Sequence, residues 1–367
     1  MKILLVGEYS NVHHTLAVAL RTLGHDVTLA TDGDGWKNYP RDIDLKRPEG
    51  KGLVSKLAYG LRLERIFARL DQYDVIQLIN PIFLPLRAER IMRYYRRLRR
   101  HTQRLYVGAF GIDFYYAKAA LDGHTFRYSD FLVGQTPHDF EDRATWMADW
   151  VEGPKGQVCR DIMADCDGIV AGLYEYHAAY VTVYGEKLAF IPFPVAVQLD
   201  KGHIRGTSGG PIRFFIGIQR HRSLYKGTDI MWRALRRVAE AYPDACEVVR
   251  VENVPFAEYC RLMDRSDVIL DQLYSYTPAM NALEAMAHGM VVVGGGEPEN
   301  YAILGEEQLR PIINVQPNER SVYEALSRLV RHPEMIADLS RQSMAYVSRH
   351  HDAQKVARQY VDFWTRG

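Results

Sequence analysis

Three cations and a histidine occupy one short segment of the sequence, Gly-Ile-Gln-Arg-His-Arg-Ser-Leu-Tyr-Lys-Gly at residues 217–227. The segment follows a strand-like apolar run and precedes a stretch with helical spacing. Cations placed here suit a diphosphate, because negative charge builds on its oxygens as the bond to it breaks. Arginine can bind such an anion through two hydrogen bonds, and lysine acts as a point charge. A solvated surface loop explains the same composition, so both interpretations stay open.

A second candidate segment begins at Tyr276 and continues as Thr-Pro-Ala-Met-Asn-Ala-Leu-Glu-Ala-Met-Ala-His-Gly. Its Thr-Pro pair resembles a helix N-cap followed by proline at the first helical position. The backbone N–H groups of Ala279 and Met280, at such a terminus, suit an anion. Glu284 lies further along this mostly apolar helix and needs a partner. A ribose diol and a nearby arginine are the two alternatives for that partner.

Three glycines at residues 294–296 form the third candidate, directly after a strand-like run. Glycine allows the backbone to approach a ligand closely, so Gly295 is a candidate ligand contact. Glu299 follows the glycines after a Glu-Pro pair. A plain turn explains this segment equally well.

Taken together, the three segments resemble the retaining GT-B glycosyltransferases, and more closely glycosyltransferase family 4. The resemblance is specific over residues 212–305 and is weaker over the N-terminal half. It implies transfer of a sugar from a nucleoside diphosphate sugar to a hydroxyl acceptor, which is a glycan, a lipid-linked compound or a small molecule. It also implies retention at the anomeric carbon and no metal or cofactor beyond the donor substrate.

The resemblance also implies roles for individual residues. Lys226 corresponds to the lysine of the donor diphosphate, and Arg222 is our first choice for its arginine, with Arg220 as the second. Glu284 corresponds to the glutamate that holds the ribose hydroxyls, and Glu299 to the glutamate after the glycines.

Tyr276 departs from the family pattern. It stands where the family has a glutamate that faces the donor sugar, and a phenol cannot supply a carboxylate. The sugar is then held differently, or activity has been lost. The second possibility defines an alternative function, a catalytically silent GT-B protein that binds a glycan or a sugar nucleotide.

Four residues of the N-terminal half are candidates for the acceptor side. His13 and His14 follow the first strand, in a loop that faces the cleft in GT-B enzymes. Asp113 ends another strand and resembles a Gly-x-Asp turn of related enzymes, although a helix-capping aspartate is the alternative. His138 lies on an expected loop and is the weakest of the four. The first strand is not followed by the G-x-G-x-x-G pattern, which argues against a dinucleotide-dependent oxidoreductase.

Strand-like and helical segments alternate along the chain, which predicts an α/β fold with two doubly wound, Rossmann-like domains facing a cleft. We place the acceptor-side domain at residues 1–200 and the nucleotide-sugar domain at residues 201–350. A polar, glycine-rich linker at residues 206–211 lies near this boundary. Residues 351–367 form a last helix, which either crosses back to the N-terminal domain or stays on its own. The expected strands are residues 3–6, 26–30, 75–79, 105–108, 168–171, 189–191, 212–216, 247–251, 268–270 and 291–293.

Composition limits the remaining possibilities. The 367 residues carry a net charge of +1 and are 47% hydrophobic, as in an average soluble protein. No apolar run approaches the length of a membrane span, and the first residues read as a strand instead of a signal peptide. Four separated cysteines fit reduced thiols in a cytoplasm. No residues show the spacing of metal ligands, so we expect no metal site.

One local concentration of charge stands out. The stretch that begins at Arg87 and ends at Arg104 contains eight arginines and one acidic residue, Glu89, with apolar residues interleaved. Such a basic amphipathic helix fits a solvated outer helix, an anionic membrane surface or a polyanion. We expect no nucleic-acid partner and keep peripheral contact with the inner membrane face as the alternative to a solvated helix. Residues 51–69 add basic and apolar residues to the same side.

Overall fold

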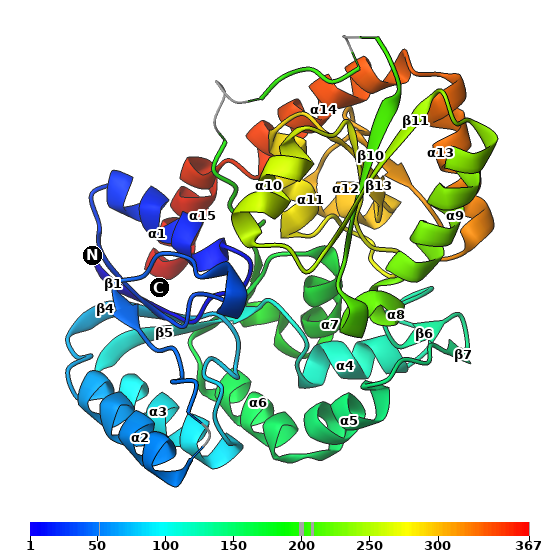
Figure 1. Cartoon of the computed structure of the whole chain (residues 1–367). Helices are drawn as coiled ribbons and strands as arrows, with labels where there is room; N and C mark the ends of the chain where they lie inside the picture. Colours follow the sequence, from blue (N-terminus) through cyan, green and yellow to red (C-terminus); the bar gives the residue numbers. More distant parts are fainter. Residues whose placement is uncertain (51, 198–201, 207–208, 367) are drawn as a thin grey trace.

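The computed structural model describes residues 1–50, 52–197, 202–206 and 209–366. It contains two parallel β-sheets, one in each half of the chain, with helices on both faces (Figure 1). The predicted α/β class with two doubly wound domains is therefore confirmed. The expected domain boundary between residues 200 and 201 lies outside the described residues, as do residues 207 and 208 of the expected linker.

The N-terminal sheet has seven strands in the order β3-β2-β1-β4-β5-β8-β9. Its central strand reads Ile-Leu-Leu-Val at residues 3–6 and is fully buried, as expected for a parallel strand that is covered on both faces. The strands are β1 (Lys2–Val6), β2 (Asp26–Thr31), β3 (Ile43–Asp44), β4 (Tyr73–Leu78), β5 (Thr102–Ala109), β8 (Gly168–Ala171) and β9 (Leu188–Phe190). A two-stranded antiparallel hairpin, β6 (Leu132–Val133) and β7 (Thr136–Pro137), projects from this domain.

Helices connect these strands and cover the sheet. The first one ends at Thr22, and Gly24 follows it with a φ of +85°, a left-handed conformation that glycine adopts at low cost. The helices of this half are α1 (Val12–Thr22), α2 (Leu53–Phe67), α3 (Ala88–Arg100), α4 (Phe114–Leu121), α5 (Arg143–Met147), α6 (Pro154–Asp165) and α7 (Tyr174–Tyr184), with short helical turns η1 (Gly35–Lys37), η2 (Ala148–Glu152) and η3 (Gly185–Lys187).

The C-terminal sheet has five strands in the order β11-β10-β12-β13-β14. Its two faces are buried in two different apolar clusters. One face packs against α9 and α13, whereas the other joins α11 and continues into the core of the N-terminal domain. The strands are β10 (Ile212–Ile218), β11 (Cys246–Glu252), β12 (Val268–Leu270), β13 (Val291–Gly294) and β14 (Ile312–Asn314); the helices are η4 (Arg220–Arg222), α8 (Ser223–Lys226), α9 (Thr228–Ala241), α10 (Phe256–Asp264), α11 (Met280–Ala287), α12 (Pro298–Leu304), α13 (Glu319–Arg331) and α14 (Met335–His350).

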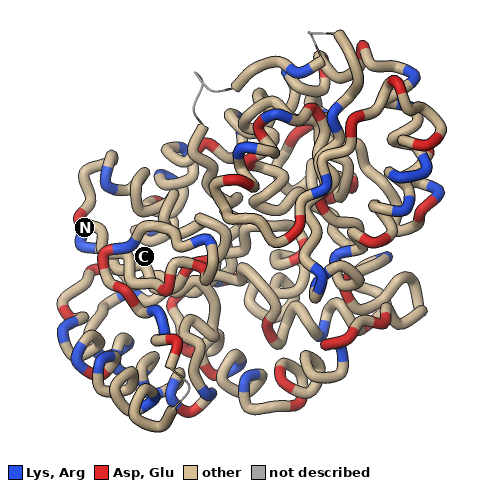
Figure 2. Tube along the Cα trace, in the orientation of Figure 1, with Lys and Arg blue, Asp and Glu red and all other residues tan. Residues whose placement is uncertain are grey.

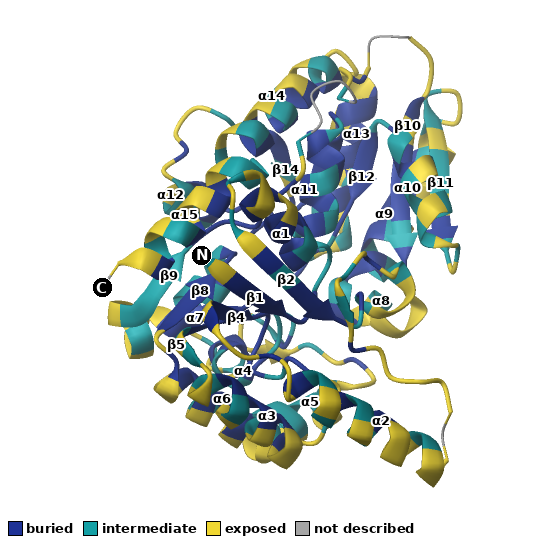
Figure 3. Cartoon of the chain, turned by 90° about the vertical axis from the view of Figure 1, so that its left-hand side faces the viewer, coloured by how far each residue is buried: buried dark blue, intermediate teal, exposed yellow. Residues whose placement is uncertain are grey.

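The last helix, α15 (Ala353–Thr365), packs against α1 of the N-terminal domain (Figures 1 and 3). Trp364 is completely buried there, and its indole N–H donates to Gln77 Oε1 at 3.4 Å. The Tyr106 hydroxyl donates to the Trp364 carbonyl at 3.2 Å. The two domains are therefore linked both by the segment before β10 and by the segment that leads into α15.

No helix in the described part of the chain is both long enough and apolar enough to cross a membrane. The four cysteines do not pair with one another.

Candidate functional site

A cavity of about 830 Å³ lies between the two domains, beyond the carboxyl ends of β10 and β12. We call it the donor cavity. In parallel sheets this edge is where ligands bind, because the loops there gather side chains from several strands. The N-terminal domain contributes Ser10, Trp36, Lys37 and Tyr39 to its wall. The C-terminal domain contributes the ends of β10 and β12, the first residues of α11 and the segment around Phe256.

The basic segment at residues 217–227 reaches the donor cavity through a tight turn. The strand β10 ends at Ile218, and the short helices η4 and α8 then place Arg220, Arg222 and Lys226 on the cavity wall. Gly227 ends α8 with a φ of +71°, and a Cβ at this position would lie 2.8 Å from Leu273. The three cations that the sequence singles out are therefore brought to one cavity.

These cations differ in their surroundings. Arg220 is exposed and forms an ion pair with Glu252. The Arg222 guanidinium lies 5.2 Å from the centre of the Tyr225 ring, and no ion pair joins it to a carboxylate among the described residues. Burial lowers the pKa of Lys226, and the nearby positive charge of Arg222 lowers it further. An anionic ligand would relieve both effects, because it would stabilise the charged forms of Lys226 and Arg222.

Asp271 also lines the donor cavity, directly after β12, and the sequence analysis did not single it out. Burial raises the pKa of this carboxyl, while Lys226, the Asn281 side chain and the Ala279 N–H act in the opposite direction. Ala279 and Met280 line the cavity at the start of α11 as predicted. The Ala279 N–H already has a protein acceptor in Asp271, however, and a ligand phosphate would have to share it.

Glu284 lines the same cavity from the second turn of α11. Burial raises its pKa to about 7, against the opposing effects of Lys37, His288 and a hydrogen bond with Asn11. Among the described residues, no ion pair joins this carboxyl group to an arginine, the partner that the alternative interpretation names. The two hydroxyls of a ribose would satisfy this carboxyl group.

The loop at residues 32–39, which follows β2, is the main contribution that the sequence analysis missed. Asp34 and Asn38 both have positive φ, which fixes an unusual path for the chain. The Lys37 ammonium donates to Asp34 Oδ2 at 2.7 Å and to Ser10 Oγ at 3.0 Å. The Trp36 ring makes an edge contact with Phe256 of the C-terminal domain, with ring centres 5.5 Å apart. In the sequence, the only signal for this loop is that it follows a strand of the predicted parallel sheet.

Tyr276 lies elsewhere than the family resemblance implies. It is only 2% exposed and does not line the donor cavity. Its hydroxyl accepts the Arg127 N–H at 2.6 Å, and the Arg127 guanidinium lies 4.7 Å from its ring centre. Phe126, Tyr128 and Tyr174 surround the ring. The tyrosine thus packs between the domains, because a large ring is buried there at less cost than a carboxylate.

Gly295 and Glu299 belong to the same interdomain contact. A Cβ on Gly295 would lie 2.1 Å from the Ser275 carbonyl oxygen, so this glycine is needed for close packing of two loops. Glu299 forms an ion pair with Arg127, whose second partner is Glu297 at 2.9 Å. Neither residue lines the donor cavity.

Glu175, the second residue of α7, joins the N-terminal domain to the loop before α11. Its Oε1 accepts the Tyr276 N–H at 2.6 Å, the Thr277 N–H at 3.1 Å and the Ser275 hydroxyl at 3.0 Å. Its Oε2 accepts the Thr277 hydroxyl at 2.6 Å. Together with Tyr276, Arg127, Glu297 and Glu299, this residue forms what we call the interdomain clamp.

The N-terminal candidates occupy supporting positions. His13 is fully buried, with its Nδ1 2.8 Å from the Gly7 carbonyl oxygen, and burial lowers its pKa to about 3. His14 Nδ1 lies 2.9 Å from the side-chain oxygen of Asn11, which in turn contacts Glu284. Both histidines therefore fix the loop that faces the donor cavity, and neither lines the cavity wall.

Asp113 is the N-cap of α4, where it accepts the Tyr116 N–H at 2.9 Å. It also accepts the Tyr180 hydroxyl at 2.6 Å, and burial raises its pKa to about 6. Asp113 thus has the position of a helix-capping aspartate, which was the alternative to a role on the acceptor side. His138 stacks on Tyr274 with ring centres 4.1 Å apart, and its Nδ1 lies 2.8 Å from the Asp130 carbonyl oxygen.

A second cavity of about 450 Å³ adjoins the donor cavity on the side of the N-terminal domain. Trp36, Lys37, Gln219 and Arg222 line both cavities, so the two meet at these side chains. The remaining wall comes from the loops that follow β1, β2 and β4. We call it the inner cavity.

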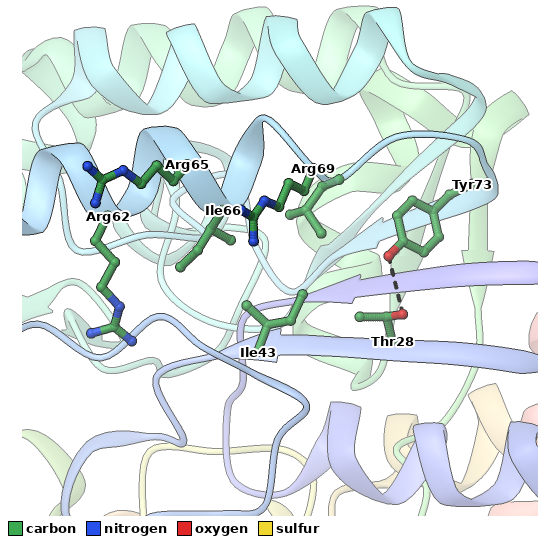
Figure 4. Close-up of a pocket in the computed structure, with 8 residues that line it drawn as sticks. Thr28, Ile43, Arg62, Arg65, Ile66, Arg69 and Tyr73 are labelled. Carbon is green, nitrogen blue, oxygen red and sulfur yellow. Dashed lines mark hydrogen bonds between the residues drawn. The ribbon is translucent and has the colours of Figure 1, made fainter.

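A third cavity, also of about 450 Å³, lies on the outside of the N-terminal domain, beside α2. Figure 4 shows Arg62 and Arg65 of α2, and Arg69 just after this helix, along the cavity, together with Ile66 of α2 and Ile43 of β3. The Tyr73 hydroxyl donates to Thr28 Oγ1 at 3.2 Å at one end. Lysine and arginine residues are dense over α2 and α3 (Figure 2).

The basic stretch at residues 87–104 forms α3 and the start of β5. Its apolar side chains Ile91, Tyr94, Tyr95 and Leu98 are all buried in the core of the domain. The amphipathic pattern therefore reflects packing against the protein, and the helix presents only its charged face to the outside.

Comparisons with known proteins agree with this geometry. Residues 209–362 match a family model described as glycosyl transferase-like. The HepE protein of Anabaena, solved in complex with UDP and glucose, is similar over 99% of this chain and 98% of its own, with a TM-score of 0.61 and 13% identity. Sucrose-phosphate synthase of Thermosynechococcus elongatus covers the same shares with a TM-score of 0.62 and 13% identity. No curated protein matches the chain in sequence.

UDP-GlcNAc 2-epimerase of Neisseria meningitidis, bound to UDP-GlcNAc, is also similar, over 99% of each chain, with a TM-score of 0.52 and 11% identity. Likeness at this level of identity shows the fold. The chain thus has the GT-B fold, and residues 209–362 are similar to the glycosyl transferase-like family. The presence of an epimerase among the neighbours means that the fold alone does not choose the reaction.

Proposed function

We propose that this chain is a glycosyltransferase that moves a sugar from a nucleoside diphosphate sugar to a hydroxyl acceptor. The observation that carries the proposal is the donor cavity itself. Arg222 and Lys226 come from one segment and Glu284 from another, and the fold brings all three to one interdomain cavity. Two cations suit a diphosphate and a carboxyl group suits a ribose diol, so the set matches these two parts of a nucleotide.

We further propose that transfer proceeds with retention and without a metal, as the resemblance to family 4 implies. The acceptor oxygen forms a bond to the anomeric carbon while the bond from that carbon to the diphosphate breaks. The acceptor proton passes to the departing diphosphate oxygen. Lys226 and Arg222 stabilise the negative charge of the leaving group, and Lys37 is a third cation at the same place.

A panel of nucleoside diphosphates tests the donor site. A ligand that binds only the folded protein stabilises it by about 2.7 kcal/mol at a hundred times its dissociation constant, and this raises the melting temperature. UDP is included because a structural neighbour holds it. Transfer is then measured with the matching nucleotide sugars. Absence of stabilisation by every nucleotide would contradict the proposal.

The alternative function, a silent protein that binds a glycan or a sugar nucleotide, is favoured by the position of Tyr276. In the clamp this residue offers the donor sugar no contact, and the carboxylate of the family pattern is missing. Nucleotide binding without transfer or donor hydrolysis, for all nucleotide sugars and a broad acceptor set, would favour this alternative. Turnover of any donor would exclude it.

We also propose a cytoplasmic protein in peripheral contact with the inner membrane face, through α2 in place of α3. The helix α2 leaves Leu53, Val54, Leu57 and Leu61 exposed, the last two at 60% and 59%. Two arginines of the third cavity, Arg62 and Arg65, lie on the same helix, and Arg69 follows its end. Exposed leucines next to arginines suit an anionic bilayer surface.

Sedimentation with vesicles of phosphatidylglycerol and phosphatidylcholine tests this contact. The double variant Leu57→Asn/Leu61→Asn is expected to lose most binding, whereas Arg96→Gln/Arg100→Gln on α3 is the matched control and is expected to bind like the wild type. Equal binding of both variants would contradict the assignment to α2.

A further inference from the structure

We infer that the inner cavity binds the acceptor, and that this acceptor is an uncharged hydroxyl compound with an apolar group beside its reacting hydroxyl. The inference rests on the proposed function and adds the chemical class of the acceptor. It also implies that acceptors which carry a phosphate are disfavoured in this cavity.

The position of the inner cavity suits an acceptor. It meets the donor cavity at Lys37, Arg222 and Gln219, the side chains that border both spaces. A diphosphate held by Arg222 and Lys226 would therefore present its bond to the sugar toward this junction. A hydroxyl in the inner cavity would lie next to that bond, on the face from which the diphosphate departs, as transfer with retention requires.

One wall of the inner cavity is apolar. Ile79, Ile82, Phe83 and Leu84 follow β4 and face Leu45 after β3. Four of these five residues are almost completely buried, so their positions are fixed by the core of the domain. Trp36 adds a ring at the junction that is 54% exposed and has room for a further contact. Such a wall binds an alkyl group or the apolar face of a sugar ring.

Acidic side chains also line the inner cavity. They are Asp32 and Asp34, which follow β2, and Glu8, which follows β1. Asp34 is held by Lys37 at 2.7 Å and by the Ser10 N–H at 2.9 Å, and Asp32 Oδ1 accepts the Asp34 N–H at 3.1 Å. The second carboxylate oxygen of Asp32 can accept a hydrogen bond from a hydroxyl of the bound compound. A hydrogen bond to a charged oxygen is strong.

The balance of charge changes when a donor is bound. Lys37 and Arg222 are the cations of this cavity, and both also face the donor cavity. A bound diphosphate would compensate their charge, which leaves the carboxylates of Asp32 and Asp34 as the remaining charges. Burial raises the pKa of Glu8 to about 8, so Glu8 is mostly uncharged at neutral pH. An acceptor phosphate would then meet two carboxylates and the donor diphosphate, which disfavours it.

Calorimetric titration with two matched probes tests the inference. Octyl glucoside and octyl phosphate share the alkyl chain and differ in the head group, which is an uncharged sugar in the first and a phosphate in the second, and both are used below their micelle concentrations. The titrations are done with and without saturating UDP. With UDP we expect octyl glucoside to bind at least about tenfold more tightly than octyl phosphate.

Variants of the cavity wall test whether this preference arises in the inner cavity. Asp32→Asn is expected to reduce this preference by about tenfold or to abolish it, because one of the two carboxylates is gone. Asp71→Asn is the matched control, since Asp71 precedes β4 at the opposite end of the sheet, and it should leave the preference unchanged. Ile82→Asn should weaken octyl glucoside and leave methyl glucoside unaffected.

Equal or tighter binding of octyl phosphate by the wild type would overturn the inference, and so would a preference that Asp32→Asn leaves intact or the absence of glycoside binding. A failure of the proposed function has a different result: no nucleoside diphosphate of the panel would then bind. The titrations without UDP still report on the inner cavity in that case.

Discussion

The donor cavity and the interdomain clamp share one short loop, but their charged groups differ in how completely protein partners satisfy them. Tyr276 and Thr277 belong to the clamp, whereas Ala279 and Met280, only a few residues on, line the donor cavity. In the clamp each carboxylate has a protein partner. The hydrogen bond with Arg127 lowers the pKa of Glu299, although burial raises that of Glu175. In the cavity burial raises the pKa of Glu284 and lowers that of Lys226.

This difference distinguishes the donor cavity, which can bind a ligand, from the clamp, which holds the two domains together. A buried charge with shifted pKa and no complete set of partners is costly in the free protein, and a ligand can supply what is missing. A charge whose partners are all present adds rigidity and leaves nothing for a ligand to gain. Variants in the two regions should therefore affect different measurements.

The largest effect is expected in the clamp. Tyr276→Ala removes a buried ring and should lower the free energy of unfolding by about 3–5 kcal/mol. Tyr276→Phe keeps the ring but leaves the Arg127 N–H without its acceptor, which should cost about 1–3 kcal/mol. Chemical denaturation measures both. Nucleotide affinity of the folded variants should stay close to that of the wild type, and a selective loss of donor affinity at unchanged stability would place Tyr276 at the donor after all.

In the donor cavity, Lys226→Ala should have the reverse profile. Loss of one charge-assisted contact to the diphosphate should weaken nucleotide binding by about 1.5–3 kcal/mol, roughly tenfold or more, and should slow transfer at least as much. Stability should change little, because the cost of burying a cation beside Arg222 disappears together with its attraction to Asp271. Arg220→Ala is the matched control from the same loop. Its partner Glu252 already compensates its charge, so a smaller loss of affinity is expected.

The sequence predicted the elements of the fold well where apolar runs and glycine stops were clear. The strands at residues 3–6, 268–270 and 291–293 and the helix before Gly289 are found within one residue of the expected ends. Those runs are buried on both faces, so burial alone determines that their residues are apolar. The hairpin of β6 and β7 went unnoticed, because strands of two residues leave no periodic pattern.

The candidate site was predicted as far as local motifs reach. Arg220, Arg222, Lys226, Ala279, Met280 and Glu284 all line the donor cavity. Lys37 and Asp271 were missed, because the first comes from a distant loop and the second lies outside the motifs. Tyr276, Gly295 and Glu299 match family positions in sequence, but contacts with Arg127 place Tyr276 and Glu299 in the clamp, and Gly295 packs against Ser275. A partner 149 residues away in the chain cannot be read from a local pattern.

A smaller effect is expected from Glu284, and it should depend on pH. With a pKa of about 7 in the free protein, this group becomes ionised as the pH rises from 6 to 8. The ionised form accepts hydrogen bonds from both ribose hydroxyls, so nucleotide affinity should increase over this interval, and Glu284→Gln should flatten the curve and weaken binding at pH 8 by about 1 kcal/mol.

The stability of the free protein should change in the opposite sense. The folded-state pKa of Glu284 lies above its ordinary value of 4.5, so ionisation of this group costs stability as the pH rises from that value to about 7. Glu284→Gln should therefore be the more stable protein at pH 8. A variant that is instead less stable, with unchanged nucleotide affinity, would show that Glu284 serves a structural partner.

The smallest effect is expected at Glu299, where the family resemblance and the structure assign different roles. Glu299→Gln removes an ion pair whose arginine is 53% exposed and keeps Glu297 as its second partner at 2.9 Å. Exposed pairs contribute about 0–1 kcal/mol, so the free energy of unfolding should fall by no more than that. Nucleotide and donor-sugar affinity should match the wild type, because the residue does not line the donor cavity. The variant is isosteric, so a loss of affinity could not be assigned to altered packing. Calorimetric titration with a nucleotide sugar therefore decides between the two roles: a tenfold loss at unchanged stability would mean that Glu299 leaves Arg127 to bind the donor, and that the clamp opens during turnover.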